Sequence, residues 1–310
     1  MWENKVIGIR GSYRNFDFPD NEDFVLLDYI PNPSEYRLCK AFVQTSICGI
    51  IKSGFCNQYK YIKQSGKPYL VVEQPVFRKN MDRNDKDNFY YRLGLWHYDF
   101  KYGDFKNKNS PPDRWLQIQK DQDISIKPWK KGGEYILILL QNPIDTSLNS
   151  LIEAYSSYPR WLDHIIFNIR KHTDEPIVIR KHPGFVQTDR FNNLDFLIDK
   201  YNHISFSCNY DGGNVTNGGT KLYEDFSAAR LAIGYNSNSL VEAVCEGIPT
   251  ISLSNESFAW EVSYHAISED SIKAQNNFDR TQWLQNCAYT QWKMSEINSG
   301  TPYRRLLDET

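Results

Sequence analysis

Residues 229–253 place a polar turn between an apolar strand pattern and an apolar helix pattern. The apolar run at residues 231–235 predicts a buried strand, and apolar residues recur at helical spacing in residues 239–244. Between the two patterns stand Asn236, Ser237, Asn238 and Ser239. Their side chains are suited to capping the helix, and such a turn offers backbone N–H groups and the positive end of the helix dipole to an anion. The segment therefore predicts a phosphate-binding turn, with a capped helix that binds nothing as the alternative.

The helix that follows this turn has a defined end. Gly247 predicts its C-terminus, and Pro249 opens the apolar strand pattern of residues 250–253. Glu242 lies in the first turn of the helix, where an acid favours the helix dipole and is also placed to accept hydrogen bonds from ribose hydroxyls. The whole segment is predicted as a β-turn-α-β unit.

A second group of polar residues follows another strand pattern. Residues 176–179 predict a β-branched strand, and Arg180, Lys181 and His182 come at its carboxyl end, before Pro183 and a glycine. Ligands of open α/β sheets bind at this edge of the sheet. Arg and Lys suit a diphosphate, and His182 is able to hydrogen-bond a phosphate oxygen or to protonate a leaving group. The alternative is a solvated basic turn.

These two groups of residues resemble the paired "HP" and "S/SS" motifs of bacterial GT-B glycosyltransferases. The first motif is matched by Lys181, His182 and Pro183, and the second by residues 235–239 with the residues 242–243 and 247–249. The family includes the capsule-type Kdo transferases and the bacterial sialyltransferases, in which both motifs hold the phosphate and ribose of the nucleotide sugar. The resemblance covers residues 134–262. Residues 254–260 depart from the family, because they lack its usual glycine-rich continuation.

Length and composition agree with a folded protein of two domains. The chain has 310 residues, 40% of them hydrophobic and 24% charged, with a net charge of −2. Disorder is therefore excluded, and the charge does not single out a polyanionic partner. No apolar run approaches the roughly 18 residues of a membrane span, and residues 1–4 show no signal-peptide pattern. We expect a cytoplasmic location, which for a phage-encoded chain is the host cytoplasm.

The elements that position these residues fall into two halves. In the first half, strands are expected at residues 5–9, 24–28 and 69–72, and helices at residues 35–51 and 57–64, with an irregular stretch from Glu73 to about residue 133. In the second half the expected strands are residues 136–140, 176–179, 204–207, 231–235 and 250–253, and the expected helices are residues 160–172, 191–201, 221–228 and 239–244. Alternating strands and helices predict parallel sheets.

The fold class predicted is therefore α/β, and the resemblance implies a GT-B fold with two Rossmann-like domains facing a cleft. The domains are predicted as an N-terminal acceptor domain of residues 1–133 with a long aromatic and basic insertion, and a C-terminal nucleotide-sugar domain of residues 134–278. A terminal helix of about residues 279–297 is expected to lie in a C-terminal segment, residues 279–310, that packs back across both domains.

The resemblance also implies the donor site. GT-B enzymes stabilise the leaving phosphate with basic side chains and helix N-termini in place of a metal. The donor-binding residues predicted here are Gln141, Arg180, Lys181, His182, Asn236, Ser237, Asn238, Ser239 and Glu242. No cofactor is expected, and a UDP- or CMP-sugar is the implied co-substrate.

An inverting transferase also needs a base that takes the proton of the acceptor hydroxyl. Glu73, at the carboxyl end of a predicted strand, is our choice, and His182 is the second catalytic residue predicted. Asp99, Asp104 and Asp113 follow as candidates. The alternative for Glu73 is a loop acid paired with Arg78.

No metal or disulfide is expected. The D-x-D patterns at residues 85–87 and 121–123 follow no convincing strand, and such short acidic patterns arise by chance. The six cysteines have no C-x-x-C spacing, so we expect reduced thiols.

The acceptor is indicated only by resemblance. Residues 72–75, 107–115 and 283–292 look similar to glycosyltransferases of large tailed bacteriophages, some of which attach glucose or arabinose to hydroxymethylcytosine in DNA. In that case Tyr91 and Trp96 would stack on a flipped base, and Arg78 and Arg114 would contact phosphate. The surrounding aromatic and basic region is equally what a solvated, aromatic-anchored loop would contain.

Three functions remain open from the sequence. The first is a cytoplasmic, metal-independent glycosyltransferase that modifies hydroxymethylcytosine in phage DNA. The second is a transferase of capsule or lipopolysaccharide synthesis, for which no membrane-facing helix is evident. The third is a non-catalytic nucleotide or nucleic-acid binding protein on the same scaffold, because fold alone does not establish activity.

Overall fold

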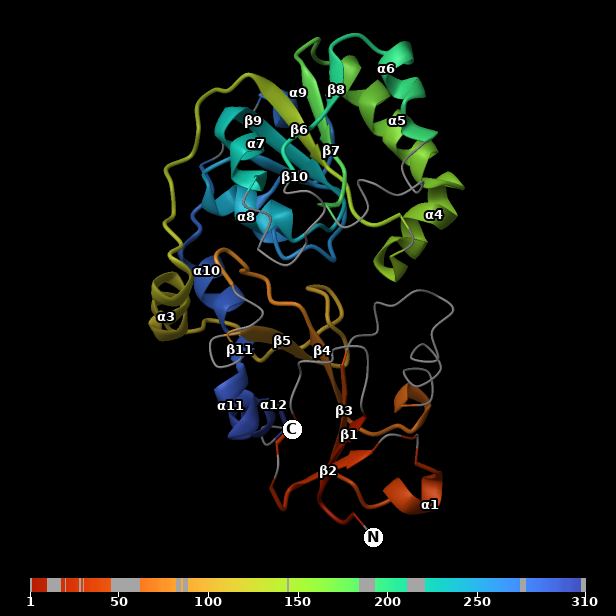
Figure 1. The fold of residues 1–310 in the computed structure, drawn as a ribbon, viewed down its shortest axis with the longest axis vertical. Helices are drawn as coiled ribbons and strands as arrows, with labels where there is room; N and C mark the ends of the chain where they lie inside the picture. The colour runs from red at the N-terminus through yellow and green to blue at the C-terminus, as the bar shows by residue number, and fades with distance from the viewer. Residues whose placement is uncertain are drawn as a thin grey trace. The chain divides into compact units, whose positions relative to one another are not determined.

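The computed structural model describes residues 2–9, 18–19, 21–27, 29, 31–45, 62–81, 85, 89–143, 145–183, 193–210, 221–273 and 277–307. The chain forms two compact units, each built on its own sheet (Figure 1). Unit 1 comprises Met1–Val76, Met81–Gln117 and Leu284–Thr310, and unit 2 comprises Phe77–Asn80 and Ile118–Trp283. These boundaries differ from the predicted ones, because residues 77–80 and 118–133 belong to unit 2 and residues 284–310 belong to unit 1.

Unit 2 contains a five-stranded parallel sheet in the order β10-β9-β6-β7-β8. Its strands are β6 (Tyr135–Leu139), β7 (Ile177–Arg180), β8 (Ile204–Phe206), β9 (Ala229–Gly234) and β10 (Thr250–Ser252). The strand order reverses direction between β6 and β9, so the loops that follow these two strands diverge at this point. Ligands of doubly wound sheets bind at such a switch point.

The helices of unit 2 connect these parallel strands. They are α4 (Asn149–Tyr155), α5 (Tyr158–Arg170), α6 (Phe196–Lys200), α7 (Leu222–Ala228), α8 (Ser239–Cys245) and α9 (Glu269–Lys273), with short 3₁₀ turns at Thr146–Leu148 and Trp260–Val262. Helix α5 buries Trp161, Leu162 and Ile166 against the apolar side chains of β6 and β7. The five strands predicted for this half and the helices predicted at residues 160–172, 221–228 and 239–244 are confirmed, with ends shifted by a few residues. Of the helix predicted at residues 191–201, residues 196–200 form α6, and residues 191–192 lie outside the described residues.

Unit 1 contains a six-stranded sheet in the order β11-β5-β4-β3-β1-β2. Strands β1 (Val6–Ile9), β2 (Phe24–Leu27), β3 (Ala41–Thr45) and β4 (Tyr69–Glu73) are parallel. Strands β5 (Tyr90–Leu95) and β11 (Gln291–Lys293) extend this sheet in antiparallel pairs. The sheet is therefore mixed, with a parallel part made by the N-terminal segment of the chain.

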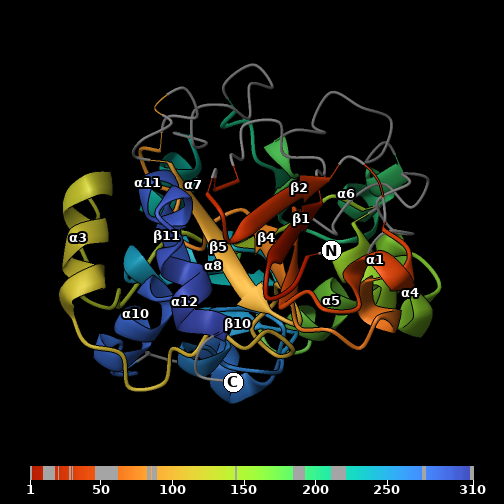
Figure 2. The same cartoon turned by 90° about the horizontal axis from the view of Figure 1, so that it is seen from below.

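The helices of unit 1 are short. The element after helix α1 (Pro33–Tyr36) is strand β3, so the helix predicted at residues 35–51 is wrong for residues 41–45, and residues 46–51 lie outside the described residues. Helices α11 (Met294–Asn298) and α12 (Thr301–Leu307) pack Ile297, Tyr303 and Leu306 against β5 (Figure 2). Of the helix predicted at residues 57–64, residues 62–64 are helical, and the rest lies outside the described residues.

Two further predictions need correction. The stretch from Glu73 to residue 133 was expected to be irregular, but it contains β5 and helix α3 (Asp113–Gln122). The C-terminal helix expected near residues 279–297 is instead helix α10 (Thr281–Ala288), strand β11 and helix α11. The strand forms because Trp292 pairs with Tyr91 across the sheet, which places a large apolar side chain in the core of unit 1.

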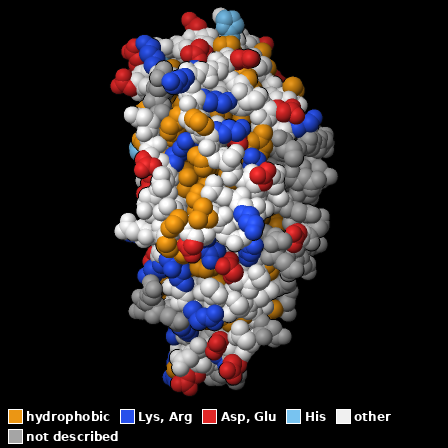
Figure 3. Space-filling model, turned by 90° about the vertical axis from the view of Figure 1, so that its left-hand side faces the viewer, with side chains coloured by type: hydrophobic (Ala, Val, Ile, Leu, Met, Phe, Trp, Pro, Cys, Tyr) orange, Lys and Arg blue, Asp and Glu red, His pale blue; other side chains and the backbone are white. Residues whose placement is uncertain are grey.

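The surface and the helices add two observations. On the face drawn in Figure 3, Lys and Arg side chains are interspersed with Asp and Glu side chains. Within the described part of the chain, no helix combines the length and the apolar character needed to cross a membrane.

The structure describes four of the cysteines. Cys39, Cys208, Cys245 and Cys287 are free thiols, as expected, whereas Cys48 and Cys56 lie outside the described residues.

Candidate functional site

Two predicted donor residues meet at the switch point of the unit 2 sheet. Gln141 follows β6 and Asn236 follows β9, and these strands are neighbours. The Asn236 backbone N–H donates to Gln141 Oε1 at 3.2 Å, and Gln141 Nε2 donates to Asn236 Oδ1. Asn236 Nδ2 also donates to Ser147 O at 3.3 Å and to Glu256 Oε2 at 3.2 Å. The amide pair therefore holds three loops together at the carboxyl edge of the sheet.

The turn into α8 differs in detail from the prediction. Asn238 is the N-cap residue, but its side chain makes no capping hydrogen bond. Instead, Ser237 Oγ accepts from the Ser239 backbone N–H at 3.3 Å, and the Ser237 carbonyl accepts from the Leu240 N–H at 3.0 Å. The backbone at Asn238 is already helical, with φ −62° and ψ −21°, whereas a capping side chain needs an extended residue. Ser237, Asn238 and Ser239 are half-buried and line the start of the helix.

The three residues Arg180, Lys181 and His182 at the carboxyl end of β7 have different environments. Arg180 is 5% exposed, and its Nη1 donates to Asp225 Oδ2 at 2.5 Å and to the Asn209 carbonyl at 2.7 Å. Its charge is thus neutralised inside unit 2 by a buried carboxylate. Lys181 Nζ lies 4.2 Å from the centre of the Phe206 ring. The predicted basic cluster is therefore divided, because its first member stabilises the fold.

His182 is held in its neutral form. Burial lowers the pKa of its imidazole from 6.5 to about 4, and the positive charges of Arg78 and Arg180 act in the same direction. A neutral imidazole is able to donate a hydrogen bond to a phosphate oxygen at pH 7, but it brings no positive charge. His182 in this state is therefore a hydrogen-bonding group, and any positive charge at the site comes from another side chain.

Glu242 lies beside a residue that the sequence assigned elsewhere. Its side chain is buried, its Oε2 accepts from the Tyr223 hydroxyl at 3.5 Å, and its Oε1 lies 3.8 Å from Arg78 Nε. Burial raises the pKa of Glu242, and the Arg78 charge opposes that rise. Arg78 was predicted to contact the acceptor. Residues Phe77–Asn80 belong to unit 2, and the Arg78 side chain lies beside α8 in that unit.

Glu73 and Trp96, the predicted base and a predicted stacking residue, both lie in unit 1. Glu73 ends strand β4 as expected, is 7% exposed, and accepts from the Gln74 backbone N–H through Oε1 at 2.8 Å. Trp96 follows β5 with a positive φ of 71°, is 40% exposed, and packs edge-to-face on Tyr69 at 5.3 Å. Their roles as base and stacking surface stay predictions.

Tyr91 and Arg114 instead take part in the packing of unit 1. Tyr91 is 3% exposed and lies in the apolar core, so its ring is not available to a base. Arg114 donates to both carboxylate oxygens of Glu296, at 2.7 and 3.0 Å, and its guanidinium lies 3.9 Å from the centre of the Trp292 ring. These contacts satisfy the charge that was expected to reach phosphate.

The acidic candidates have local partners. Asp99 is 2.8 Å from His97 Nδ1, Asp104 accepts from the Lys106 backbone N–H at 3.0 Å, and Asp113 accepts from the Tyr289 hydroxyl at 2.8 Å. Among the described residues, no group of three or more His, Cys, Asp or Glu side chains is arranged to hold a metal ion. The absence of a metal from the reaction stays a prediction.

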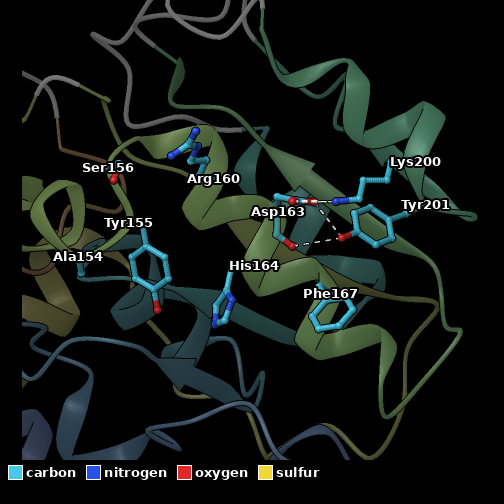
Figure 4. A pocket seen from close by; sticks show the side chains of 9 residues that line it. All are labelled: Ala154, Tyr155, Ser156, Arg160, Asp163, His164, Phe167, Lys200 and Tyr201. Carbon is cyan, nitrogen blue, oxygen red and sulfur yellow. Dashed lines mark hydrogen bonds and ion pairs between the residues drawn. The ribbon is translucent and has the colours of Figure 1, made fainter.

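A separate hollow of about 420 Å³ lies on the outside of unit 2 (Figure 4). It is formed by the end of α4, by α5 and by the end of α6, with Arg160, His164 and Phe167 from α5. Asp163 at its side accepts hydrogen bonds from Lys200 and Tyr201. None of the predicted site residues lines it, so the hollow is distinct from the candidate site.

Sequence reasoning did not single out Asp225 and Tyr223, which contact the predicted residues Arg180 and Glu242. Both come from α7, and Asp225 accepts from Arg180, from Ser207 Oγ at 2.7 Å and from Asn209 Nδ2 at 2.6 Å. A signal was present, because Asp225 shares the buried face of α7 with Leu222 and Phe226. An acid on an apolar helix face requires a buried partner.

The fold is the GT-B fold, with two Rossmann-like units. Neither a family model nor a curated protein sequence matches the chain. Among solved structures, the chain is similar to the β-Kdo 2,4-transferase of Thermosulfurimonas dismutans KpsC, with a TM-score of 0.54 and 11% identity over 93% of this chain and 90% of that one. The β-Kdo 2,7-transferase of the same KpsC matches with a TM-score of 0.51 and 10% identity over 95% of this chain and 97% of that one. Identities this low establish the fold alone.

Proposed function

We propose that the protein is a glycosyltransferase that binds a nucleotide-sugar donor at the carboxyl edge of the unit 2 sheet. The observation that carries the proposal is that His182, Gln141 and the Asn236 turn into α8 follow the neighbouring parallel strands β7, β6 and β9, and that Gln141 and Asn236 are hydrogen-bonded to each other. A neutral imidazole and half-buried Ser and Asn side chains suit a phosphate and a ribose, which need several hydrogen-bond donors and acceptors. The donor is a UDP- or CMP-sugar, and no cofactor takes part.

The donor part of the proposal is tested by binding. Thermal unfolding is measured with UDP, CMP, GDP and ADP and with their common sugars, without metal, for the wild type and His182→Ala. A bound nucleotide stabilises the native state, so one nucleotide should raise the melting temperature of the wild type and raise that of the variant less. No shift with any nucleotide at millimolar concentration would reject a donor site.

Transfer itself is proposed to invert the sugar, with Glu73 as the base. Glu73 ends β4 and is buried. A carboxylate shielded from solvent is suited to accept the proton of the acceptor hydroxyl. Glu73→Gln should abolish turnover and leave donor affinity unchanged. Donor binding by a wild-type protein that shows no turnover with any acceptor would favour the alternative, a non-catalytic nucleotide or nucleic-acid binding protein.

The acceptor is proposed to be 5-hydroxymethylcytosine in DNA. Two exposed rings of unit 1 support this, because Trp96 is 40% and Tyr102 is 54% exposed, and Lys101 Nζ lies 4.6 Å from the centre of the Tyr102 ring. Such rings beside a cation are suited to bases and phosphates. Labelled UDP- and CMP-sugars are incubated with hydroxymethylated DNA, unmodified DNA and a capsule-type glycan. Transfer to the glycan alone would instead favour capsule or lipopolysaccharide synthesis.

A further inference from the structure

The segment Phe77–Asn80 belongs to unit 2, although the residues before it in the sequence belong to unit 1. It contains two positive side chains. Hydrogen bonds hold its backbone and its last side chain against the end of α3. Gln122 Nε2 donates to the Phe77 carbonyl at 3.2 Å, and Asn80 Nδ2 donates to the Gln122 carbonyl at 3.2 Å. Arg78 and Lys79 lie between these two anchors. The segment is therefore fixed in place, and its two cations face acids of α8.

The two cations pair with Glu242 in α8 and with Glu246, the residue that caps its C-terminus. Lys79 Nζ lies 3.6 Å from Glu246 Oε1 and 4.9 Å from the centre of the Tyr223 ring, and Lys127 contacts the same Glu246. Arg78 Nε lies 3.8 Å from Glu242 Oε1. At that distance the Arg78 pair is an ion pair without a hydrogen bond, so the guanidinium keeps its hydrogen-bonding capacity for another acceptor.

Arg78 differs from the two basic residues at the carboxyl end of β7. Arg180 is 5% exposed and hydrogen-bonded to Asp225, and Lys181 lies over the Phe206 ring. The Arg78 side chain is 36% exposed, whereas its partner Glu242 is 7% exposed. Of the two arginines, Arg78 is the one that combines access to solvent with the weaker pairing to an acid. A guanidinium of this kind is suited to bidentate binding of a phosphate.

Arg78 lies beside the first turn of α8, because its Nε is 3.8 Å from Glu242 Oε1. Its positive charge also helps to lower the pKa of His182. The neutral imidazole supplies a hydrogen bond and no charge. A phosphate at this point still needs a positive charge to balance its own, and Arg78 is the side chain placed to supply it.

We propose that Arg78 binds the phosphate groups of the donor and that its guanidinium leaves Glu242 for the phosphate when the donor binds. The nucleotide part rests on the proposed function. Glu242 then remains with the Tyr223 hydroxyl, 3.5 Å away, and is free to accept ribose hydroxyls. The buried carboxylate of Glu242 and the phosphate of the donor therefore compete for the Arg78 guanidinium.

The competition makes two substitutions act in opposite directions. Arg78→Gln removes the cation, so the affinity for inorganic pyrophosphate should fall about tenfold or more. Glu242→Gln removes the competing acid, so the affinity for pyrophosphate should rise, because this probe has no ribose for Glu242 to bind. Lys79→Gln removes the same charge one residue further on and should change the affinity less than about threefold. An Arg78–Glu242 pair that only stabilised the fold would give no such opposite effects.

The test is titration calorimetry of wild type, Arg78→Gln, Lys79→Gln and Glu242→Gln with pyrophosphate, UDP and CMP. Thermal unfolding of each variant verifies that it is folded, and Arg78→Lys should recover part of the lost affinity. Equal binding of UDP, CMP and pyrophosphate by wild type and Arg78→Gln, or an equal loss in Lys79→Gln, would overturn the inference and leave the proposed function standing. Binding of pyrophosphate through Arg78 without binding of any nucleotide would support the inference and reject the nucleotide donor. If the wild type binds none of the three probes, both are overturned.

Discussion

Arg180 Nη1 donates to Asp225 Oδ2 at 2.5 Å inside unit 2, and the two side chains are 5% and 1% exposed. Ser207 Oγ and Asn209 Nδ2 also donate to Asp225, so the carboxylate is fully hydrogen-bonded. Removing one member of such a pair leaves a buried charge without its partner. The relationship explains why a basic residue at the carboxyl end of β7 serves the fold.

Asp225→Asn should therefore destabilise the protein strongly. The amide retains the shape of the side chain but leaves the Arg180 charge uncompensated, which costs about 3–5 kcal/mol in the free energy of unfolding. Urea denaturation followed by circular dichroism measures the change. Glu269→Gln breaks the fully exposed Lys273–Glu269 pair of α9 and should leave stability unchanged. Similar small effects of both substitutions would show that the buried pair is not required.

His182 should make stability depend on pH in a defined direction. Its pKa is about 4 in the folded protein and 6.5 in the unfolded chain. The unfolded chain therefore binds the proton more readily between these values. The contribution is complete above pH 6.5 and is lost as the pH falls toward 4, by up to about 3 kcal/mol.

The matching variant is His182→Gln, which retains a polar side chain that does not titrate. Urea denaturation at pH 7.0 and at pH 4.5 should show a smaller loss of stability on acidification for the variant than for the wild type. Acidic side chains contribute to the loss of stability in both proteins, so the difference between the losses of wild type and variant reports the contribution of His182. Equal losses would contradict the lowered pKa.

The Gln141–Asn236 pair should behave as one unit. The two side chains hydrogen-bond each other, so Gln141→Ala and Asn236→Ala each break the same interaction. In a double-mutant cycle on unfolding, the pair should show a coupling energy of about 0.5–3 kcal/mol. Asn168, whose Nδ2 contacts His164 within α5, supplies the control, because Gln141→Ala and Asn168→Ala should be additive. Additive effects for both pairs of substitutions would show that the Gln141–Asn236 interaction contributes no coupling energy to the stability of the fold.

Much of unit 2 was predictable from local sequence. Its strands β6 and β9 are short apolar runs buried on both faces, which local patterns identify. Parallel order brings the residues after these strands to one edge, where Gln141 and Asn236, both predicted as donor-binding residues, are in contact. Their hydrogen bond was not predicted. The side-chain pairing of Arg180 was not predicted either, because its partner Asp225 lies on a helix that reaches the site only in the folded chain.

Unit 1 was less predictable because its pairings are distant in sequence. Strands β5 and β11 pair Tyr91 with Trp292, and nothing in either segment specifies the other. Residues Ala41–Thr45 were read as helix, yet they form a strand because β1 and β4 pair with them on both sides. The position of Arg78 has the same cause. The segment Phe77–Asn80 belongs to unit 2, whereas the residues before and after it in the sequence belong to unit 1.

Gly247 is required where α8 ends against another segment of unit 2. Its φ is +75°, and a Cβ at this position would lie 2.1 Å from the Pro128 carbonyl oxygen. Residues 127 and 130 flank that contact, because the Lys127 N–H donates to the Cys245 carbonyl at 2.9 Å and the Lys130 N–H donates to the Gly247 carbonyl at 2.7 Å. The backbone on both sides is hydrogen-bonded, so it has little room to move.

Gly247→Ala should therefore cost more than backbone strain alone. A left-handed backbone costs a residue with a side chain roughly 1–2 kcal/mol, and the clash with Pro128 should raise the total above about 3 kcal/mol. Gly66 supplies the matched control, because its φ is +70° and a Cβ there meets no atom within 4 Å. Gly66→Ala should cost only the strain. Equal losses of unfolding free energy in the two variants would show that the contact between Gly247 and Pro128 is not close.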